Sequence, residues 1–244
     1  MKLLAPTPTP PDALDTTLRE QGHAVLEPRA VSRLAGCPLD DLIALRASWD
    51  DLPPDRYLKD GGRYRKRRHS SFVVEGGEVT LAPHRAHWQP VEYNALHGGM
   101  QRWFEPVAPQ VGQAPAWLAL LRWMGRVASA LKGKQPWYVE AHQFRIDTEG
   151  GIGRPTPEGA HRDGVDLVAV FLVAREGIKG GETRVFEADG PRGERFTLTE
   201  PWSLLLLDDE RVIHESTPIQ PVGEQGGHRD TLVVTYRAGG FQGG

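Results

Sequence analysis

The chain has 244 residues, of which 39% are hydrophobic and 25% charged, and this composition excludes wholesale disorder. Its 29 basic and 32 acidic side chains give a formal net charge of −3, which excludes a general attraction to nucleic acid or to an anionic membrane. The single cysteine, Cys37, excludes an intrachain disulfide, and no apolar stretch approaches the ~20 residues of a membrane-spanning helix. Because the N-terminus also lacks the apolar core of a secretory signal, a cytoplasmic location is expected.

The first half of the chain predicts helices that flank one β-like stretch. Residues 1–11 are rich in proline and are expected to form a disordered lead, which leaves residues 12–244 as a single domain. Apolar periodicity and turn residues predict, in chain order, a helix over 12–21, a short strand over 23–26, a helix over 38–49, a turn-rich β-like stretch over 57–81 and the clearest helix over 114–131.

The second half predicts strands with no helix between them. Short segments rich in β-forming residues, separated by glycine and proline, occur at 137–146, 165–174, 182–186, 195–198, 202–207 and 231–236. Helices followed by a run of strands favour an antiparallel barrel or a double-sheet roll over a βαβ fold. The predicted class is therefore α+β, mainly β, with helices beside the β core.

Candidate metal ligands lie just before the strand predicted at 165–174. His161 and Asp163 are two residues apart, and such residues point to the same side of an extended segment. His214, which follows a buried strand and an acidic turn, is the best candidate for a third ligand. Two histidines and one carboxylate leave positions of an octahedral ion open, as in non-haem iron(II) oxygenases, whereas four protein ligands close a structural zinc site. H-x-D alone is also common at surfaces and helix caps, so the residues downstream matter.

Two further residues suit a carboxylate ligand. Arg229 and Thr231 open the last predicted strand and share one of its faces. A guanidinium fork beside a hydroxyl is a suitable binding surface for a buried carboxylate. An exposed strand arginine is the alternative interpretation of Arg229.

The succession of H-x-D, a distal histidine and R-x-T resembles the signature of the Fe(II)/2-oxoglutarate-dependent dioxygenases. The surrounding sequence resembles the bacterial isoleucine-dioxygenase-like group, which includes hydroxylases of free aliphatic amino acids and homologues linked to biofilm and stress phenotypes. The resemblance covers about residues 20–237. The segments that carry it are His161–Asp166, Val168–Arg175, Gly180–Thr183, Leu207–His214, Thr217–Ile219 and, upstream, Gln89–Asn94 with Gly98–Gly99.

This resemblance implies a double-stranded β-helix fold and a set of cofactors. His161, Asp163 and His214 would hold Fe(II), and Arg229 would bind the distal carboxylate of 2-oxoglutarate with Thr231 beside it. With O2, 2-oxoglutarate would be decarboxylated to succinate and CO2 while a substrate is oxidised. The cofactor supplies this chemistry, and the protein supplies orientation and shielding.

Side chains for the substrate itself are expected on two strands. Arg65 and Arg67 would share a face if the basic run at 63–69 is a strand, and they could meet an amino acid carboxylate; a solvated face and nucleic-acid binding are the alternatives. Gln143 and Arg145 share a face of the strand at 137–146, where they could line the site or meet solvent. His84, His87 and His97 have no metal-ligand spacing to a carboxylate, which favours polar or hydrogen-bonded roles.

The resulting hypothesis is an enzyme that hydroxylates or sulfoxidises a free aliphatic amino acid, with a small molecule rather than nucleic acid or membrane as its partner. A first alternative is a 2-oxoglutarate oxygenase of proteins or peptides, because Gly180–Thr183 with Phe186 also resembles prolyl hydroxylases. A second is a metal-binding regulatory or stress protein that keeps the site as a sensor. An intact triad with Arg229 favours catalysis, since a sensor has no need of an open metal face.

Overall fold

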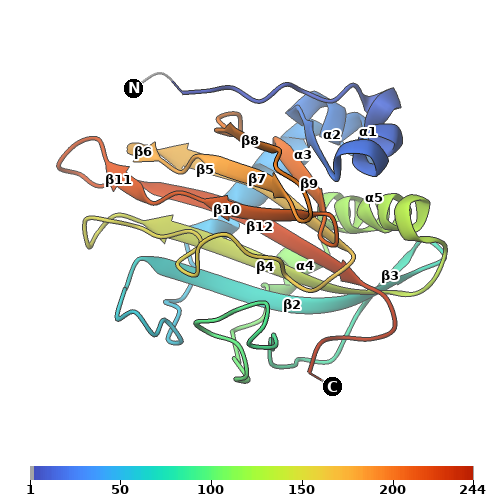
Figure 1. Ribbon diagram of the computed structural model, residues 1–244. Helices are drawn as coiled ribbons and strands as arrows, with labels where there is room; N and C mark the ends of the chain where they lie inside the picture. Colours follow the sequence, from blue (N-terminus) through green and yellow to red (C-terminus); the bar gives the residue numbers. More distant parts are fainter. Residues whose placement is uncertain (1–2, 244) are drawn as a thin grey trace.

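The computed structural model describes residues 3–243, and its helices lie before residue 133, with three strands of the large sheet between them (Figure 1). The helices are α1 (Leu14–Gln21), α2 (Pro28–Ala35), α3 (Leu39–Leu45), α4 (Pro109–Gly112) and α5 (Pro115–Lys132), with 3-10 turns η1 (Pro11–Ala13) and η2 (Arg46–Trp49). In the described part of the chain, none of them is long and apolar enough to cross a membrane. The predicted helices at 12–21, 38–49 and 114–131 are present with shifted ends.

Antiparallel strands form two layers. The strands are β1 (His23–Leu26), β2 (Arg65–Glu75), β3 (Glu78–Leu81), β4 (Trp137–Asp147), β5 (Leu167–Glu176), β6 (Ile178–Gly180), β7 (Thr183–Glu187), β8 (Gly193–Phe196), β9 (Leu204–Asp208), β10 (Val212–Ser216), β11 (Ile219–Pro221) and β12 (His228–Arg237). A seven-stranded sheet has the order β1-β9-β5-β12-β4-β2-β3, and smaller sheets, β10-β7-β8 and β11-β6, complete the roll. The expected α+β, mainly β double-stranded β-helix with N-terminal helices is confirmed.

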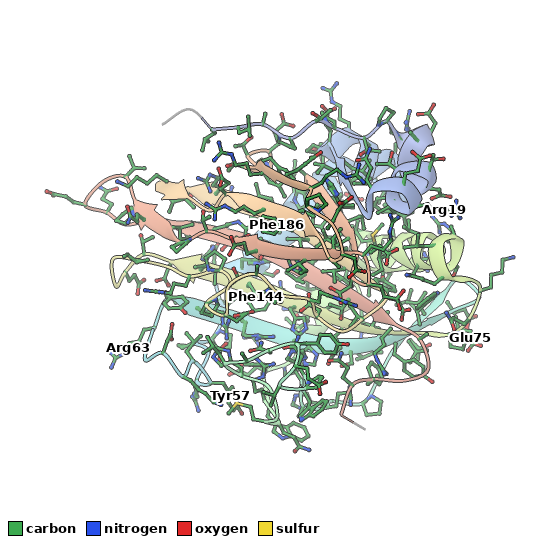
Figure 2. The ribbon with its side chains drawn as sticks, viewed as in Figure 1. Arg19, Tyr57, Arg63, Glu75, Phe144 and Phe186 are labelled. Carbon is green, nitrogen blue, oxygen red and sulfur yellow. The ribbon has the colours of Figure 1, made fainter. Side chains whose placement is uncertain are left out.

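The two faces of the large sheet have different partners, because side chains alternate along a strand. On β12, Leu232, Val234 and Tyr236 belong to the main apolar core together with residues of the helices, including Trp117 of α5. The other face of the large sheet turns toward the interior of the roll, where Phe144 of β4 lies between the layers (Figure 2). The helices therefore cover one face and leave the other to form a cavity.

The N-terminal segment differs from the expected disordered lead. The backbone N–H of Thr9 donates to the carbonyl of Val25 at 2.7 Å, and the Thr9 side chain is buried. Further toward the N-terminus, the carbonyl of Leu4 accepts from the N–H of Thr197 at 2.8 Å. These hydrogen bonds fasten residues 3–10 to the strands, while residues 1 and 2 lie outside the described part.

Helix α2 and strand β10 are not among the predicted elements. Helix α2 has only eight residues, begins at Pro28 and ends before Gly36, which adopts a left-handed φ of 72°. Strand β10 carries His214. Its sequence, VIHES, lacks the alternation of apolar and polar residues that predicts a strand. Tertiary pairing with β7 rather than local pattern defines this strand.

Candidate active site

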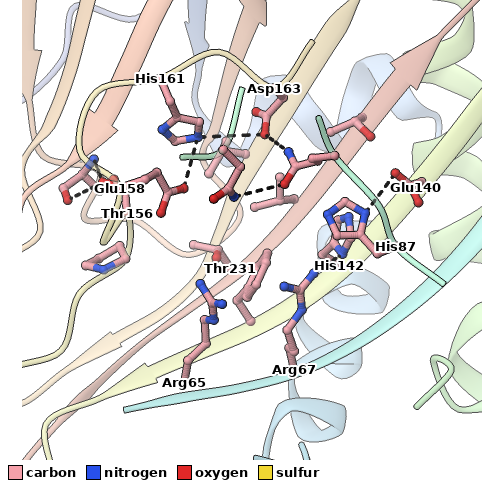
Figure 3. A pocket seen from close by; sticks show the side chains of 18 of the residues that line it. Arg65, Arg67, His87, Glu140, His142, Thr156, Glu158, His161, Asp163 and Thr231 are labelled. Carbon is pink, nitrogen blue, oxygen red and sulfur yellow. Dashed lines mark hydrogen bonds and ion pairs between the residues drawn. The ribbon is translucent and has the colours of Figure 1, made fainter. Parts of the chain in front are cut away.

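A pocket opens inside the roll, and side chains from β2, β4, β5, β10, β12 and the segments before β5 line it (Figure 3). His161, Asp163 and His214 lie at one wall, and Arg229 and Thr231 also line the cavity. Arg65 and Arg67 point into it from β2. The structure therefore brings the three predicted metal ligands, the two predicted cosubstrate residues and two of the four predicted substrate residues into one cavity.

Backbone pairing places the two histidines of the triad side by side. The N–H of His161 donates to the carbonyl of His214, and the reverse hydrogen bond has the same length of 3.0 Å. The Nε2 atoms of the two histidines each lie 3.9 Å from a carboxylate oxygen of Asp163. One donor atom from each of the three side chains lies within 4.8 Å of the others. The three side chains thus converge on one point.

The hydrogen bond of His161 and the neutral ring of His214 suit a metal ion. His161 Nδ1 lies 3.0 Å from the carbonyl of Gly159, so Nδ1–H donates there and the Nε2 lone pair faces the triad. Burial, helped by His161, holds the pKa of His214 well below the ordinary value, so this ring is neutral. Burial lowers and the carboxylates of Asp163 and Glu158 raise the pKa of His161, with a net rise. Two imidazole nitrogens and one carboxylate are a donor set that fits Fe(II).

Asp209 holds the turn that carries Asp163. Its carboxylate accepts the N–H groups of Asp163, Gly164 and Val165 at 3.0, 2.7 and 3.1 Å. Burial, followed by the charge of Asp163, raises the pKa of Asp209 to about 6. Gly164 has φ 74°, and a Cβ there would meet the ring of Tyr93 at 2.4 Å. Only glycine therefore fits the position after this ligand.

Arg229 is a buried cation without a protein anion. Among residues 3–243, no hydrogen bond or ion pair with another residue satisfies its guanidinium. Burial, followed by the nearby charge of Arg175, lowers the pKa of Arg229 to about 10, and Asp230 opposes this. Thr231 lies on the same face of β12 and is also buried. A bound carboxylate would supply the missing counter-charge.

Arg65 and Arg67 are buried on β2, on the other side of β4 from Arg229 and Thr231 and level with them in the sheet. Arg65 Nε donates to the carboxylate of Asp55 at 2.7 Å, so this cation is already paired. The guanidinium of Arg67 lies between the rings of Phe104 and Phe144, 3.8 and 4.4 Å from their centroids. Its Nη1 is 3.8 Å from Asp55, and its Nε has no partner among the described residues. The two aromatic rings therefore hold the guanidinium of Arg67, and its Nε–H can still donate a hydrogen bond to a ligand.

Arg102 is a pocket residue that the sequence analysis missed. Its side chain is 2% exposed, and its Nη2 donates to Gln89 Oε1 at 2.9 Å. No described carboxylate lies within ion-pair distance of it, and its Nε is unpartnered. Burial, followed by the charge of Arg65, lowers its pKa to about 10. Arg102 lies in an irregular segment, where no periodicity indicates which way a side chain points.

Gln89 connects Arg102 to the triad. Its Nε2 donates to Asp163 Oδ1 at 3.2 Å, while its Oε1 accepts from Arg102 and from Asn94 Nδ2 at 3.2 Å. The amide orientation is fixed, because only the oxygen can accept from a guanidinium. Gln89 thus orients a candidate metal ligand, Asp163, and a buried cation, Arg102.

The expectation that Gln143 and Arg145 line this site is wrong, because they lie on the opposite face of β4. Gln143 is fully buried and donates to Ser48 Oγ at 2.7 Å. Arg145 pairs with the buried Asp230 at 2.7 and 2.8 Å. The residues of β4 that line the pocket are Glu140, His142, Phe144 and Ile146.

A second group of potential metal ligands adjoins the pocket, and its histidines are not those of the H-x-D pattern. His69, His87, Glu140 and His142 are buried, with donor atoms within 4.8 Å of one another. Glu140 accepts from His69 Nε2 and His87 Nδ1, both at 3.1 Å. His87 thus has a carboxylate partner that is remote in sequence.

Hydrogen bonding explains this second group without a metal. Arg67 Nη2 donates to His142 Nδ1 at 2.7 Å and so uses the only lone pair of that neutral ring. Arg85 Nη1 lies 3.9 Å from Glu140, so a dication here would sit among guanidinium groups. Distance alone fits a metal ion in either group, but charge and tautomer favour His161, Asp163 and His214.

Comparisons with known proteins agree with this geometry. The sequence matches the 2OG-Fe dioxygenase family over residues 46–235. A solved structure of a bsmA homologue from Methylobium petroleophilum PM1 is 53% identical, with a TM-score of 0.92 over 99% of this chain and 98% of that one. IDO from Bacillus thuringiensis shares the fold at 15% identity and a TM-score of 0.76, covering 99% and 100% of the two chains. A prolyl-4-hydroxylase from Pseudomonas putida shares it at 17% identity and a TM-score of 0.53, covering 95% and 100%.

No curated protein matches the sequence. The family match nevertheless spans most of the chain, and the similarity to the bsmA homologue spans nearly all of it. The chain therefore belongs to the 2OG-Fe dioxygenase family, whose members use Fe(II), 2-oxoglutarate and O2.

Proposed function

We propose that this protein oxidises a free amino acid, with iron(II) held by His161, Asp163 and His214. In this proposal, bound iron(II) would supply the oxidative chemistry, and 2-oxoglutarate and O2 would yield succinate and CO2 together with the oxidised amino acid. The family and the convergence of three suitable donors support the metal assignment. The remaining roles follow from the charges that line the cavity.

Arg229 binds the distal carboxylate of 2-oxoglutarate. Its guanidinium is buried and lacks a protein anion, and Arg175 adds a second positive charge nearby. Thr231 offers a hydroxyl beside it on β12. Val170 and Val233 line the same cavity and keep water from the cosubstrate.

The surplus of buried positive charge at Arg67 and Arg102 is the observation that supports an amino acid substrate. Asp55 pairs with Arg65, whereas Arg102 has no anionic partner among the described residues. A free carboxylate on the substrate would compensate this charge through charge-assisted hydrogen bonds. A residue inside a polypeptide has no such carboxylate. The apolar wall, which includes Phe144, Ile146 and Val165, suits an aliphatic or thioether side chain.

The test is direct oxidation of free amino acids. The protein is purified without oxygen, supplied with iron(II), ascorbate and 2-oxoglutarate, and offered each of the twenty amino acids. Mass spectrometry should show a gain of one oxygen on leucine, isoleucine or methionine, with cross-reactivity, because one methylene is worth only ~1–3 kcal/mol of discrimination. Succinate formation should accompany it and disappear in a His161→Ala control. Oxidation of a peptide with none of any free amino acid would refute the proposal.

A further inference from the structure

The carboxylates near the pocket differ in how well they are paired. Asp55 accepts from Arg65, and Glu140 accepts from two histidines. Asp209 accepts three backbone N–H groups, and Asp163 accepts from Gln89 while facing the other metal ligands. Each of these four side chains has a structural partner. Glu158 is different.

Glu158 is a nearly buried carboxylate without a hydrogen bond. Its side chain is 11% exposed, and the nearest basic group is His161 Nε2, 3.6 Å from Oε1. Its Oε2 is buried and has no partner among the described residues. Figure 3 shows Glu158 at the pocket wall beside His161. His161 compensates this charge only at Oε1, and a buried carboxylate oxygen without a hydrogen bond is costly, so a further cationic donor is the expected complement.

The segment that carries Glu158 is fastened in place. Thr156 Oγ1 donates to the carbonyl of Ser216 at 3.0 Å and accepts from its N–H at 3.1 Å. Upstream, Gly153 exchanges backbone hydrogen bonds with Ile219 at 2.8 and 3.0 Å. Downstream, His161 pairs with β10. Anchors on both sides hold the carboxylate at the cavity before any ligand arrives.

Glu158 lies beside the triad without completing it. Its carboxylate oxygens are not among the donor atoms that lie within 4.8 Å of one another in the triad. It is also close enough to Arg102 to raise the pKa of that guanidinium, against the larger lowering by burial and Arg65. The carboxylate therefore acts on the same cavity as the cation proposed to bind the substrate carboxylate.

We propose that Glu158 accepts hydrogen bonds from the substrate's α-ammonium group while Arg102 and Arg67 bind its carboxylate. This inference rests on the proposed function and adds the residue that selects for a free amine. An amino acid is a zwitterion, and the pocket offers a buried anion and a surplus of buried cations to its two charges. A 2-hydroxy acid or an N-acylated amino acid has the carboxylate but no ammonium, so Glu158 discriminates against both.

The experiment compares L-leucine, L-isoleucine and L-methionine with their 2-hydroxy acids, in wild type and in Glu158→Gln. Glutamine keeps the shape and removes the charge. The wild type should prefer the amino acid, and Glu158→Gln should lower kcat/KM for the amino acid about 10- to 100-fold, as expected for one charge-assisted hydrogen bond. Turnover of the 2-hydroxy acid should not fall. The matched control is Glu149→Gln, an exposed glutamate of the same segment, 78% exposed, which should behave as wild type.

A second measurement separates substrate recognition from metal binding. Manganese(II) titrated into wild type and Glu158→Gln by calorimetry should bind with the same affinity. A ten-fold loss of manganese(II) affinity in Glu158→Gln would show that Glu158 is a metal ligand and overturn the inference. The inference would also be overturned if Glu158→Gln kept the wild-type preference for the amino acid over its 2-hydroxy acid. If the wild type oxidises none of the twenty amino acids, the proposed function fails at that point, before the variant is compared.

Discussion

Protonation of His87 should make the protein labile to mild acid. His87 is buried against Glu140 and His142, and burial, as the largest cause, lowers its pKa to about 4 from the ordinary 6.5. A histidine with a depressed pKa in the folded state takes up a proton more readily when unfolded. Its contribution to stability is therefore complete above about pH 6.5 and is lost as the pH falls toward 4.

The size of this effect follows from the shift. At pH 5.0 the unfolded histidine is almost fully protonated and the folded one is mostly neutral, which favours unfolding by about 2 kcal/mol relative to pH 7.5. Desolvation raises the pKa of Glu140, but His87 and His69 lower it further, so this carboxylate remains ionised in the folded state over this range. Asp209, whose pKa is raised to about 6, also takes up a proton in this window, so the comparison of wild type with a His87 variant, and not the window itself, isolates His87.

The assay is urea unfolding of wild type and His87→Gln at pH 7.5 and 5.0. Glutamine retains an N–H donor for Glu140 but does not titrate, so the variant should lose about 2 kcal/mol less stability between the two pH values. His84→Gln, which changes a histidine outside this cluster on the same segment, should keep the wild-type difference. If the change in the free energy of unfolding between pH 7.5 and 5.0 agrees within about 0.5 kcal/mol for His87→Gln and wild type, the argument from the burial of His87 is refuted.

Three further substitutions test separate parts of the site. Arg229→Ala should raise the 2-oxoglutarate concentration needed for half-maximal succinate formation about 10- to 100-fold and leave KM for the amino acid nearly unchanged. An unaltered 2-oxoglutarate dependence would exclude Arg229 as the group that binds this cosubstrate. Gln89→Leu should weaken manganese(II) affinity about 10- to 100-fold in calorimetry, because Asp163 loses a donor that orients it; equal affinity would contradict this. Arg145→Ala should lower the free energy of unfolding by about 3–5 kcal/mol, since the buried Asp230 loses both hydrogen bonds from the guanidinium and keeps only His228, 3.5 Å away. A loss below about 1 kcal/mol would count against the contribution of this pair.

The sequence predicts most of the strands and the candidate metal ligands next to them. His161 and Asp163 share a side because they are two residues apart before β5, and the buried strand β9 leads to His214. Alternation on β12 likewise puts Arg229 and Thr231 on one face. What the sequence does not contain is the backbone pairing of His161 with His214, which is a long-range contact.

Alternation could not decide which face of β4 meets the pocket, because both faces are buried. Gln143 is buried under η2 by its hydrogen bond to Ser48, while His142, on the other face, contacts Arg67. Polar residues therefore occur on both faces of β4, so polarity does not indicate which face meets the pocket. Arg102 and Glu158 were missed for a related reason: each lies in an irregular segment whose direction is fixed by tertiary hydrogen bonds.

The charges of the cavity also explain how two carboxylate-bearing ligands would take different places in it. Both Arg229 and Arg102 can bind a carboxylate, so carboxylate affinity alone does not sort the cosubstrate from the substrate. Near Arg229 the second charge is another cation, Arg175, and an ammonium about 4 Å from such a group is disfavoured by ~4 kcal/mol at an intermediate dielectric. Near Arg102 the cation of Arg65 is accompanied by the carboxylates of Asp55, Glu158 and Glu140. Of these, Glu158 has an oxygen without a partner among the described residues, so it repels a second carboxylate and attracts an ammonium. A dicarboxylate is thus directed to Arg229 and a zwitterion to Arg102, which Gln89 links to Asp163 of the triad.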